Sequence, residues 1–254
     1  MIASRHAVAI PKNVTGGLPD PTELDLAEAF EALARARAEA RPSSITSALL
    51  RVGQIHSTRL EAEPALAAFQ EVRSLGVRLG ERYDVAAADD LIGLLWCHLG
   101  EPSRALELHQ RSAAEFASLG SAPDESLARS FAAWALLEME QPAEALVEAR
   151  MAEQVEPGNG LGGTMGIALA DLGRLDEAHL HVEPLPAPTA GPFAWFARVA
   201  AHVASRAGES EVAGEVFAQA LHMLELTGDK AEHRCCLRQM ERLGLFPGTT
   251  GRRP

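Results

Sequence analysis

The chain has 254 residues, of which 47% are hydrophobic, so it can bury a large core. Its formal net charge of −12 would repel a phosphate backbone, which argues against nucleic-acid binding by the chain as a whole. Aromatic residues make up only 5%, and alanine, leucine, glutamate and arginine dominate, so the composition predicts an all-α fold.

The cysteines and the hydropathy bear on where the protein works. Cys97, Cys235 and Cys236 are odd in number and form no CxxC pair, so we expect reduced thiols and a cytoplasmic location. No apolar run approaches the roughly 18 residues that cross a bilayer. The apolar patch at residues 7–10 is too short for the core of a secretory signal. We therefore expect no membrane partner.

The N-terminal part of the chain predicts a tail and then a single helix. Residues 1–20 lack periodicity, and we expect them to be disordered. Residues 22–40 are predicted to be helical, with Ala29, Leu33 and Ala36 on one face. A helix at this position would cap a helical array, whose last repeat has no neighbour to cover it.

Five helical hairpins are predicted next, at about 44–80, 84–119, 124–157, 159–185 and 193–228. Each contains a small residue that an alanine follows twelve positions later: Gly53 and Ala65, Gly93 and Ala105, Ala133 and Ala145, Gly166 and Ala178, Ala201 and Ala213. Antiparallel helices approach closely only where side chains are small, so this spacing predicts the hairpin crossings. Glycines at the turns, Gly100, Gly173 and Gly208, suit left-handed helix C-caps.

Prolines interrupt this array, and a last helix comes after it. The stretch from Pro184 to Pro192 cannot be helical, which shortens the second helix of the fourth hairpin. It is either an ordinary loop between repeats or a hinge. Residues 229–244 are predicted to form the second capping helix, with Arg238 and Arg242 largely solvated, and residues 245–254 a disordered tail.

One motif recurs in two of the hairpins, as Leu91-Ile92-Gly93, Leu99-Gly100 and Arg104-Ala105-Leu106, and as Gly166, Leu172-Gly173 and Asp176-Glu177-Ala178. The motif underlies a resemblance to the tetratricopeptide repeat (TPR) family. The resemblance covers roughly residues 44–228, and the first two repeat intervals are longer than usual, as in long-helix bacterial variants. It implies a right-handed superhelical solenoid in which the first helices of successive hairpins line a concave groove.

Mapped onto this chain, the resemblance predicts a partner-binding groove. Its lining residues are Leu94, His98, Trp134, Glu138, Ile167, Asp171, Arg198, His202 and Arg206. The middle of this set is apolar and its end is cationic, which would suit a protein or peptide with an apolar centre and an acidic end. The alternative is that the cationic end pairs with the chain's own carboxylates, such as Asp171 or Glu209.

Motifs for catalysis or cofactor binding are weak. Gly158-Asn159-Gly160-Leu161-Gly162-Gly163 matches the letters of a dinucleotide fingerprint but comes after a predicted helix instead of a strand. There is no HExxH motif, and His179 and His181 would point to different helix faces. A triad assembled by folding stays open at this stage. Cys235 and Cys236 form either a redox-active pair or a structural one with one thiol partly exposed.

These observations favour an interaction module or scaffold with no catalytic activity and no cofactor. An alternative is the sensor or regulatory arm of a bacterial transcription regulator or signalling system. A third, with less support, is a pathway-specific enzyme built on a TPR scaffold. The sequence does not indicate an oligomeric state.

Overall fold

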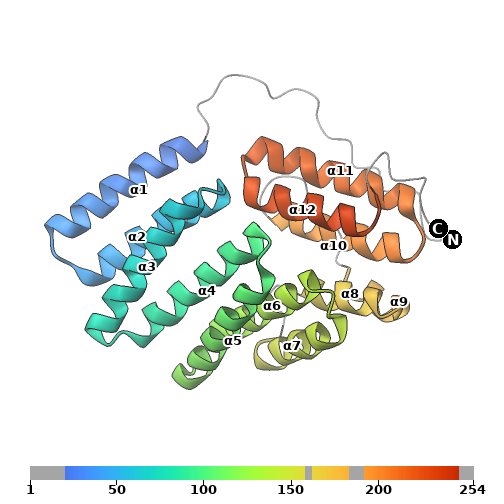
Figure 1. Cartoon of the computed structure of the whole chain (residues 1–254), viewed down its shortest axis with the longest axis horizontal. Helices are drawn as coiled ribbons and strands as arrows, with labels where there is room; N and C mark the ends of the chain where they lie inside the picture. Colours follow the sequence, from blue (N-terminus) through green and yellow to red (C-terminus); the bar gives the residue numbers. More distant parts are fainter. Residues whose placement is uncertain (1–20, 158–161, 183–191, 246–254) are drawn as a thin grey trace.

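The computed structural model describes residues 21–157, 162–182 and 192–245, and within these ranges the chain forms α-helices and no strand (Figure 1). The all-α prediction is therefore confirmed. The helices are α1 (Pro21–Ala38), α2 (Pro42–Thr58), α3 (Ala62–Leu79), α4 (Arg82–Leu99), α5 (Pro102–Leu119), α6 (Ala122–Glu138), α7 (Pro142–Val155), α8 (Gly162–Asp171), α9 (Leu175–His179), α10 (Pro192–Arg206), α11 (Ser210–Thr227) and α12 (Lys230–Arg242).

Helices that are consecutive in the chain pack against one another, as a solenoid of hairpins requires. The pairs α2–α3, α4–α5, α6–α7, α8–α9 and α10–α11 coincide with the five predicted hairpins, and the chain curves into an arc from α1 to α11 (Figure 1). Among the described residues, no helix is both long enough and apolar enough to span a bilayer.

The hairpin crossings depend on small residues, as the spacing predicts. The alanines that open the second helices are fully buried: Ala65, Ala105, Ala145, Ala178 and Ala213. A β-carbon on Gly93 would lie 2.8 Å from Cε1 of His109, and one on Gly53 would overlap the Phe69 ring. Each of these glycines thus makes room for a ring that lies one turn beyond the alanine in the partner helix.

The turns use left-handed backbone conformations. Gly100, Gly173 and Gly208 have φ values of 84°, 74° and 86°, which confirms the predicted helix caps. At the corresponding turn of the third hairpin, Glu140 adopts φ 59° without being a glycine. The turn geometry is therefore shared even where the glycine is missing.

The fourth hairpin is the shortest of the five, since α8 has 10 residues and α9 only 5. This agrees with the expectation that its second helix is cut short. The tails predicted to be disordered lie outside the described residues, apart from Leu245. Residues 158–161 of the glycine-rich stretch also lie outside the described residues. The same holds for the proline-rich stretch as far as residue 191, while Pro192 begins α10.

The last helix does more than cover the end of the array. Besides α11, α12 contacts α10, and also α2 and α4 from the first two hairpins (Figure 1). A simple end cap would touch only its neighbours in the chain, so the expectation for this helix was incomplete. Because α12 turns back along the inside of the arc, it covers side chains of the other helices that face this side (Figure 1).

Candidate partner-binding surface

The nine residues predicted to line a groove do not all lie on one surface. Eight of them lie near α12 or near residues that contact it, and we call these eight the inner surface: Leu94, His98, Trp134, Glu138, Asp171, Arg198, His202 and Arg206. Ile167 instead packs into the core with Leu136, Leu169 and Val199. The predicted apolar row through Leu94, Trp134 and Ile167 is therefore not formed.

Arg198 of α10 is the centre of the inner surface. It is 1% exposed, and it forms an ion pair with Glu232 of α12 and donates from Nε to Oε1 of Gln239 at 3.0 Å. Its guanidinium carbon lies 5.6 Å from the ring centroid of Trp134 and 5.4 Å from that of Trp195. Burial between two indoles is tolerable for a cation only because α12 supplies the counter-charge.

The carboxylate partner of Arg198 is correspondingly acidic. Burial would raise the pKa of Glu232, but the charge of Arg198 and the nearby ring of His98 outweigh burial and lower that pKa to about 2. Nε2 of His98 lies 3.5 Å from Oε1 of Glu232. The Arg198 pKa is in turn raised, since Glu232 offsets the effect of burial. The pair is therefore fully charged at neutral pH.

A second chain of polar contacts runs outward from α12. Gln239 bonds Nδ1 of His202 at 3.0 Å, and Nε2 of His202 bonds Oδ1 of Asp171 at 2.8 Å. Arg206 also donates to Oδ1 of Asp171, at 2.6 Å. Burial alone would raise the pKa of Asp171, but its contacts with His202 and Arg206 outweigh burial and lower that pKa. The cationic stripe thus pairs with the chain's own carboxylates, through Asp171 as the alternative interpretation proposed and through Glu232, which it did not name.

Two arginines of α12 bind the ends of helices from earlier hairpins. Arg238 donates to the carbonyl oxygens of Cys97 at 2.8 Å and His98 at 2.9 Å, in the last turn of α4. Arg242 donates to the carbonyl oxygen of Leu137 at 2.9 Å, at the end of α6. Helix C-termini carry unpaired carbonyls and partial negative charge, so cations are favourable there. The carboxylate of Glu138 pairs with both arginines.

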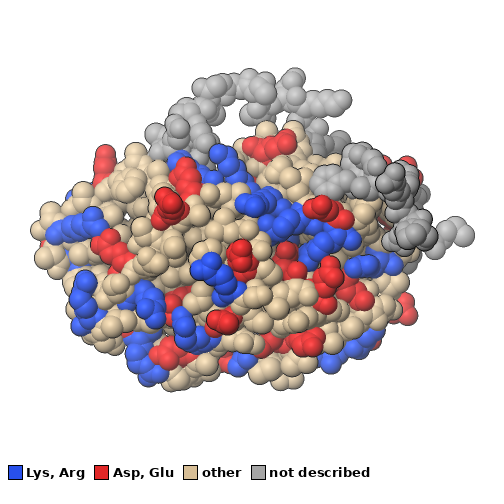
Figure 2. All heavy atoms as spheres, viewed as in Figure 1, with Lys and Arg blue, Asp and Glu red and all other residues tan. Residues whose placement is uncertain are grey.

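The expectation of an open groove was therefore wrong, because α12 covers it. Trp134, Arg198 and His202 are all less than 5% exposed. Arg238 is not solvated as expected but is half-buried against α4, whereas Arg242 is exposed, as expected, although it binds the end of α6. The sequence does carry one signal of this arrangement: basic residues recur every four positions along α12, at Lys230, Arg234, Arg238 and Arg242, and Figure 2 shows positive side chains gathered there.

The thiols give no sign of catalysis. Cys97, Cys235 and Cys236 are free and buried, and burial raises their pKa values, to about 12 for Cys235 and about 11 for Cys236. They are therefore protonated and poor nucleophiles at neutral pH. The expectation that one thiol of the Cys235–Cys236 pair is partly exposed was wrong.

A carboxylate–histidine pair also lies in the core. Nδ1 of His109 bonds Oδ1 of Asp90 at 2.6 Å, but the His109 ring is fully buried beneath Gly93 and Phe131, so a substrate has no access to it. In the described part of the chain, no three His, Cys, Asp or Glu side chains are placed to hold a metal ion.

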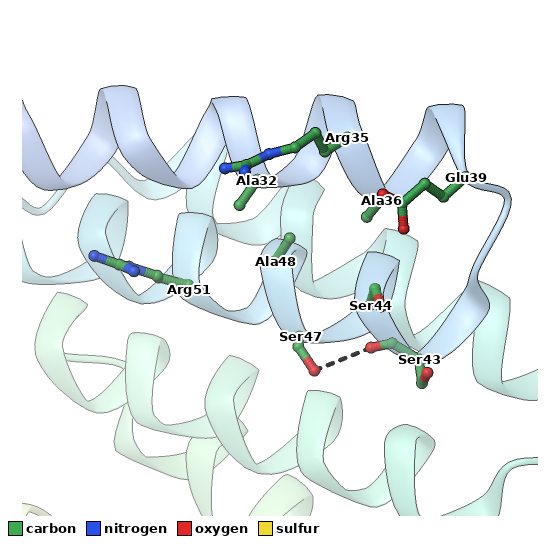
Figure 3. Close-up of a pocket in the computed structure, with 9 residues that line it drawn as sticks. All are labelled: Ala32, Arg35, Ala36, Glu39, Ser43, Ser44, Ser47, Ala48 and Arg51. Carbon is green, nitrogen blue, oxygen red and sulfur yellow. Dashed lines mark hydrogen bonds between the residues drawn. The ribbon is translucent and has the colours of Figure 1, made fainter.

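An open hollow of about 540 Å³ lies between α1 and α2, at the N-terminal end of the array (Figure 3). It exists because small side chains meet there, with Ala32 and Ala36 facing Ala48 and three serines. The Ser47 hydroxyl donates to the carbonyl of Ser43, and Arg51 pairs with Asp25 and Glu28. The Ser47 hydroxyl and the Arg51 guanidinium therefore already have partners within the chain.

No protein-family model matches this chain, and no curated protein matches it either. The resemblance to TPR proteins therefore stays a prediction that rests on the repeat residues. The inner surface and α12 are the features from which a function can be inferred.

Proposed function

We propose that this chain is a protein-interaction module whose inner surface holds a helical segment of a partner, and that α12 occupies this surface when the partner is absent. The supporting observation is that side chains and backbone carbonyls from α4, α6 and α10, far apart in the sequence, hold one helix through its charged side chains.

The chemistry of α12 defines the partner that would fit. Near its N-terminus α12 carries the acidic Glu232, which pairs with Arg198. Its centre is apolar, with Cys235 against Trp134 and Cys97, and Cys236 and Met240 in the cluster around Phe217. This is the apolar centre and acidic end expected of a partner. Arginines in the partner's last two turns would complete the match by reaching the ends of α4 and α6.

The free-energy cost of releasing α12 is expected to be small. It has 13 residues, and an isolated helix of this length is marginal in water. Gly228 and Asp229 alone join it to α11, and Gly228 adopts φ 70°. A two-residue link keeps α12 at high effective concentration, so a partner must bind more strongly than α12 to replace it. Local opening of such terminal helices is common.

The proposal places the protein in the cytoplasm, where the three free thiols would stay reduced, and assigns it no catalytic activity. The proposed ligand of the inner surface is a soluble protein or peptide.

A labelled peptide of residues 229–245, added to the full chain, tests the proposal. In wild type, the attached α12 competes with the peptide. The double variant Arg238→Ala/Arg242→Ala weakens α12 but leaves Arg198 in place, so we expect it to bind the peptide at least about tenfold more tightly than wild type. Fluorescence anisotropy measures the affinity.

Arg234→Ala is the matched control, because Arg234 lies on the same stripe of α12 but is exposed and forms no ion pair with a described residue. It should bind the peptide like wild type. A peptide with Glu232→Gln should bind the double variant more weakly. If the double variant and Arg234→Ala bind equally, the inner surface does not exchange helices and the proposal fails.

A further inference from the structure

A cavity of about 460 Å³ lies on another part of the molecule, in the groove between α3 and α5. These are the second helices of the first two hairpins (Figure 1), and Asp89, Ile92 and Trp96 of α4 complete the lining. The volume falls in the range of small-molecule sites. The proposed exchange of helices on the inner surface does not use this groove, so a role for the groove is independent of that function.

The cavity is strongly cationic for an acidic chain. Three arginines line it, Arg73 from α3 and Arg104 and Arg111 from α5, and Asp89 is the acidic residue among its lining side chains. Oδ1 of Asp89 accepts from Nε of Arg73 at 2.9 Å, and Oδ2 lies 2.8 Å from Nη2 of Arg111. One buried carboxylate thus pairs with two of the three cations, and the lining side chains carry an excess of two positive charges.

Arg104 is the cation that Asp89 does not neutralise. Its guanidinium carbon lies 3.5 Å from the centroid of the Trp96 ring. Stacking of this kind fixes the plane of the guanidinium and leaves its N–H groups pointing outward along the edge. Among the described residues, no carboxylate pairs with Arg104, although the chain has a net charge of −12.

The arginines are also held in place before any ligand arrives. The Asp89 side chain is 5% exposed, whereas those of Arg73 and Arg111 are 46% and 55% exposed. Asp89 therefore anchors each guanidinium from below, and their outer N–H groups have no described partner. Anchoring reduces the entropy lost on binding, and arginine forks match the oxygens of phosphate and carboxylate groups.

We infer that this cavity binds a small organic dianion, a phosphate monoester or a dicarboxylate. Its two negative charges balance the excess charge of the three arginines. Its organic group packs against Leu66, Leu108 and the exposed part of the Trp96 ring, which line the same cavity. Two functions of the chain would then lie on separate surfaces, helix binding on the inner side and anion binding between α3 and α5.

Calorimetric titration of the full chain with three probes at constant ionic strength tests this inference. Phenyl phosphate and phthalate represent the two sources of a dianion, and inorganic phosphate represents the charge without an organic group. We expect saturable binding of phenyl phosphate or phthalate, at least about threefold tighter than inorganic phosphate. Equal binding of all three, or no saturable heat with any, would overturn the inference.

Arg104→Gln and Arg78→Gln form a matched pair of variants. Both remove one positive charge from an exposed side chain, but Arg78 lies on α3 outside the cavity. We expect Arg104→Gln to weaken binding of the tighter dianion at least about tenfold, and Arg78→Gln to change it less than about twofold. The melting temperatures of both variants should match wild type. Equal weakening by both variants would mean diffuse attraction without a site.

Discussion

Gly93 and Gly214 show that the same residue type can be required in one helix and dispensable in another. Both lie inside helices, where alanine is favoured over glycine by about 1 kcal/mol. A β-carbon on Gly93 would lie 2.8 Å from a His109 ring that is buried and held by Asp90. At Gly214, by contrast, the added carbon would meet no atom within 4 Å apart from its neighbours in the chain and the backbone of its own helix.

We therefore expect the two alanine substitutions to change the free energy of unfolding in opposite directions. Gly93→Ala overpacks the crossing and should lower the free energy of unfolding by about 1 kcal/mol, even after the gain in helix propensity. Gly214→Ala should raise it by about 0.5 to 1 kcal/mol. Urea denaturation measures both. Stabilisation by Gly93→Ala would show that the crossing has more room than the structure gives it.

Glu232 gives the inner surface a dependence on pH. Its pKa is about 2 in the folded chain, against an ordinary value of 4.5. Because the folded-state pKa is depressed, the stabilisation from the ionised carboxylate is fully present above about pH 4.5 and is lost as the pH falls toward about 2.

The comparison of wild type with Glu232→Gln isolates this carboxylate from the other acids, which both proteins share. Wild type should be the more stable at neutral pH, and the gap in the free energy of unfolding should narrow steadily below about pH 4.5. Chemical denaturation at several pH values measures the gap. A gap that stays constant across this range would mean that Glu232 is not paired with Arg198 in solution.

At the scale of a single helix, the twelve-residue spacing predicts which alanines lie at the buried crossing of two helices. Ala105 is fully buried at the crossing of α4 and α5, whereas Ala114 of the same helix α5 is exposed. Ala105→Leu should cost about 1 to 3 kcal/mol of unfolding free energy, and Ala114→Leu should be nearly neutral. Equal thermal midpoints for the two variants would contradict the hairpin assignment.

The helices and their pairing could be predicted because their signals are local. The interval from Gly93 to Ala105 and the turn at Gly100 lie within a single hairpin, so one stretch of sequence contains both sides of the contact. Ile167 shows the limit of such signals. Its position relative to Gly166 matches that of Trp134 relative to Ala133, yet it packs in the core, because the short α8 is covered by neighbours on more than one side.

The covering of the inner surface could not be predicted in this way. Arg238 and the carbonyl of Cys97 are 141 residues apart, and no periodicity links them. The contact depends on the curvature of the whole arc, which accumulates over several hairpins. The resemblance, mapped onto the repeats, predicted all eight residues of the inner surface and wrongly added Ile167, which lies in the core. It did not show that a segment of the same chain fills that surface.

At the scale of the whole molecule, α12 joins the two ends of the array. Its contacts with α2 and α4 link the first hairpins to the last, and its Glu232 and Gln239 side chains bind the buried guanidinium of Arg198. Departure of α12 would uncover Arg198, Trp134 and His202 together. The proposed function therefore requires that α12 and a partner helix are alternatives on one surface.

Hydrogen–deuterium exchange of the full chain, with and without saturating amounts of an isotope-labelled peptide of residues 229–245, tests that requirement most directly. The isotope label separates fragments of the peptide from those of the chain by mass. We expect the amides of the chain's own residues 230–242 to exchange faster when the peptide is bound, while those of α3 and α5 are unchanged. Unchanged protection of residues 230–242 at saturation would contradict the exchange of helices.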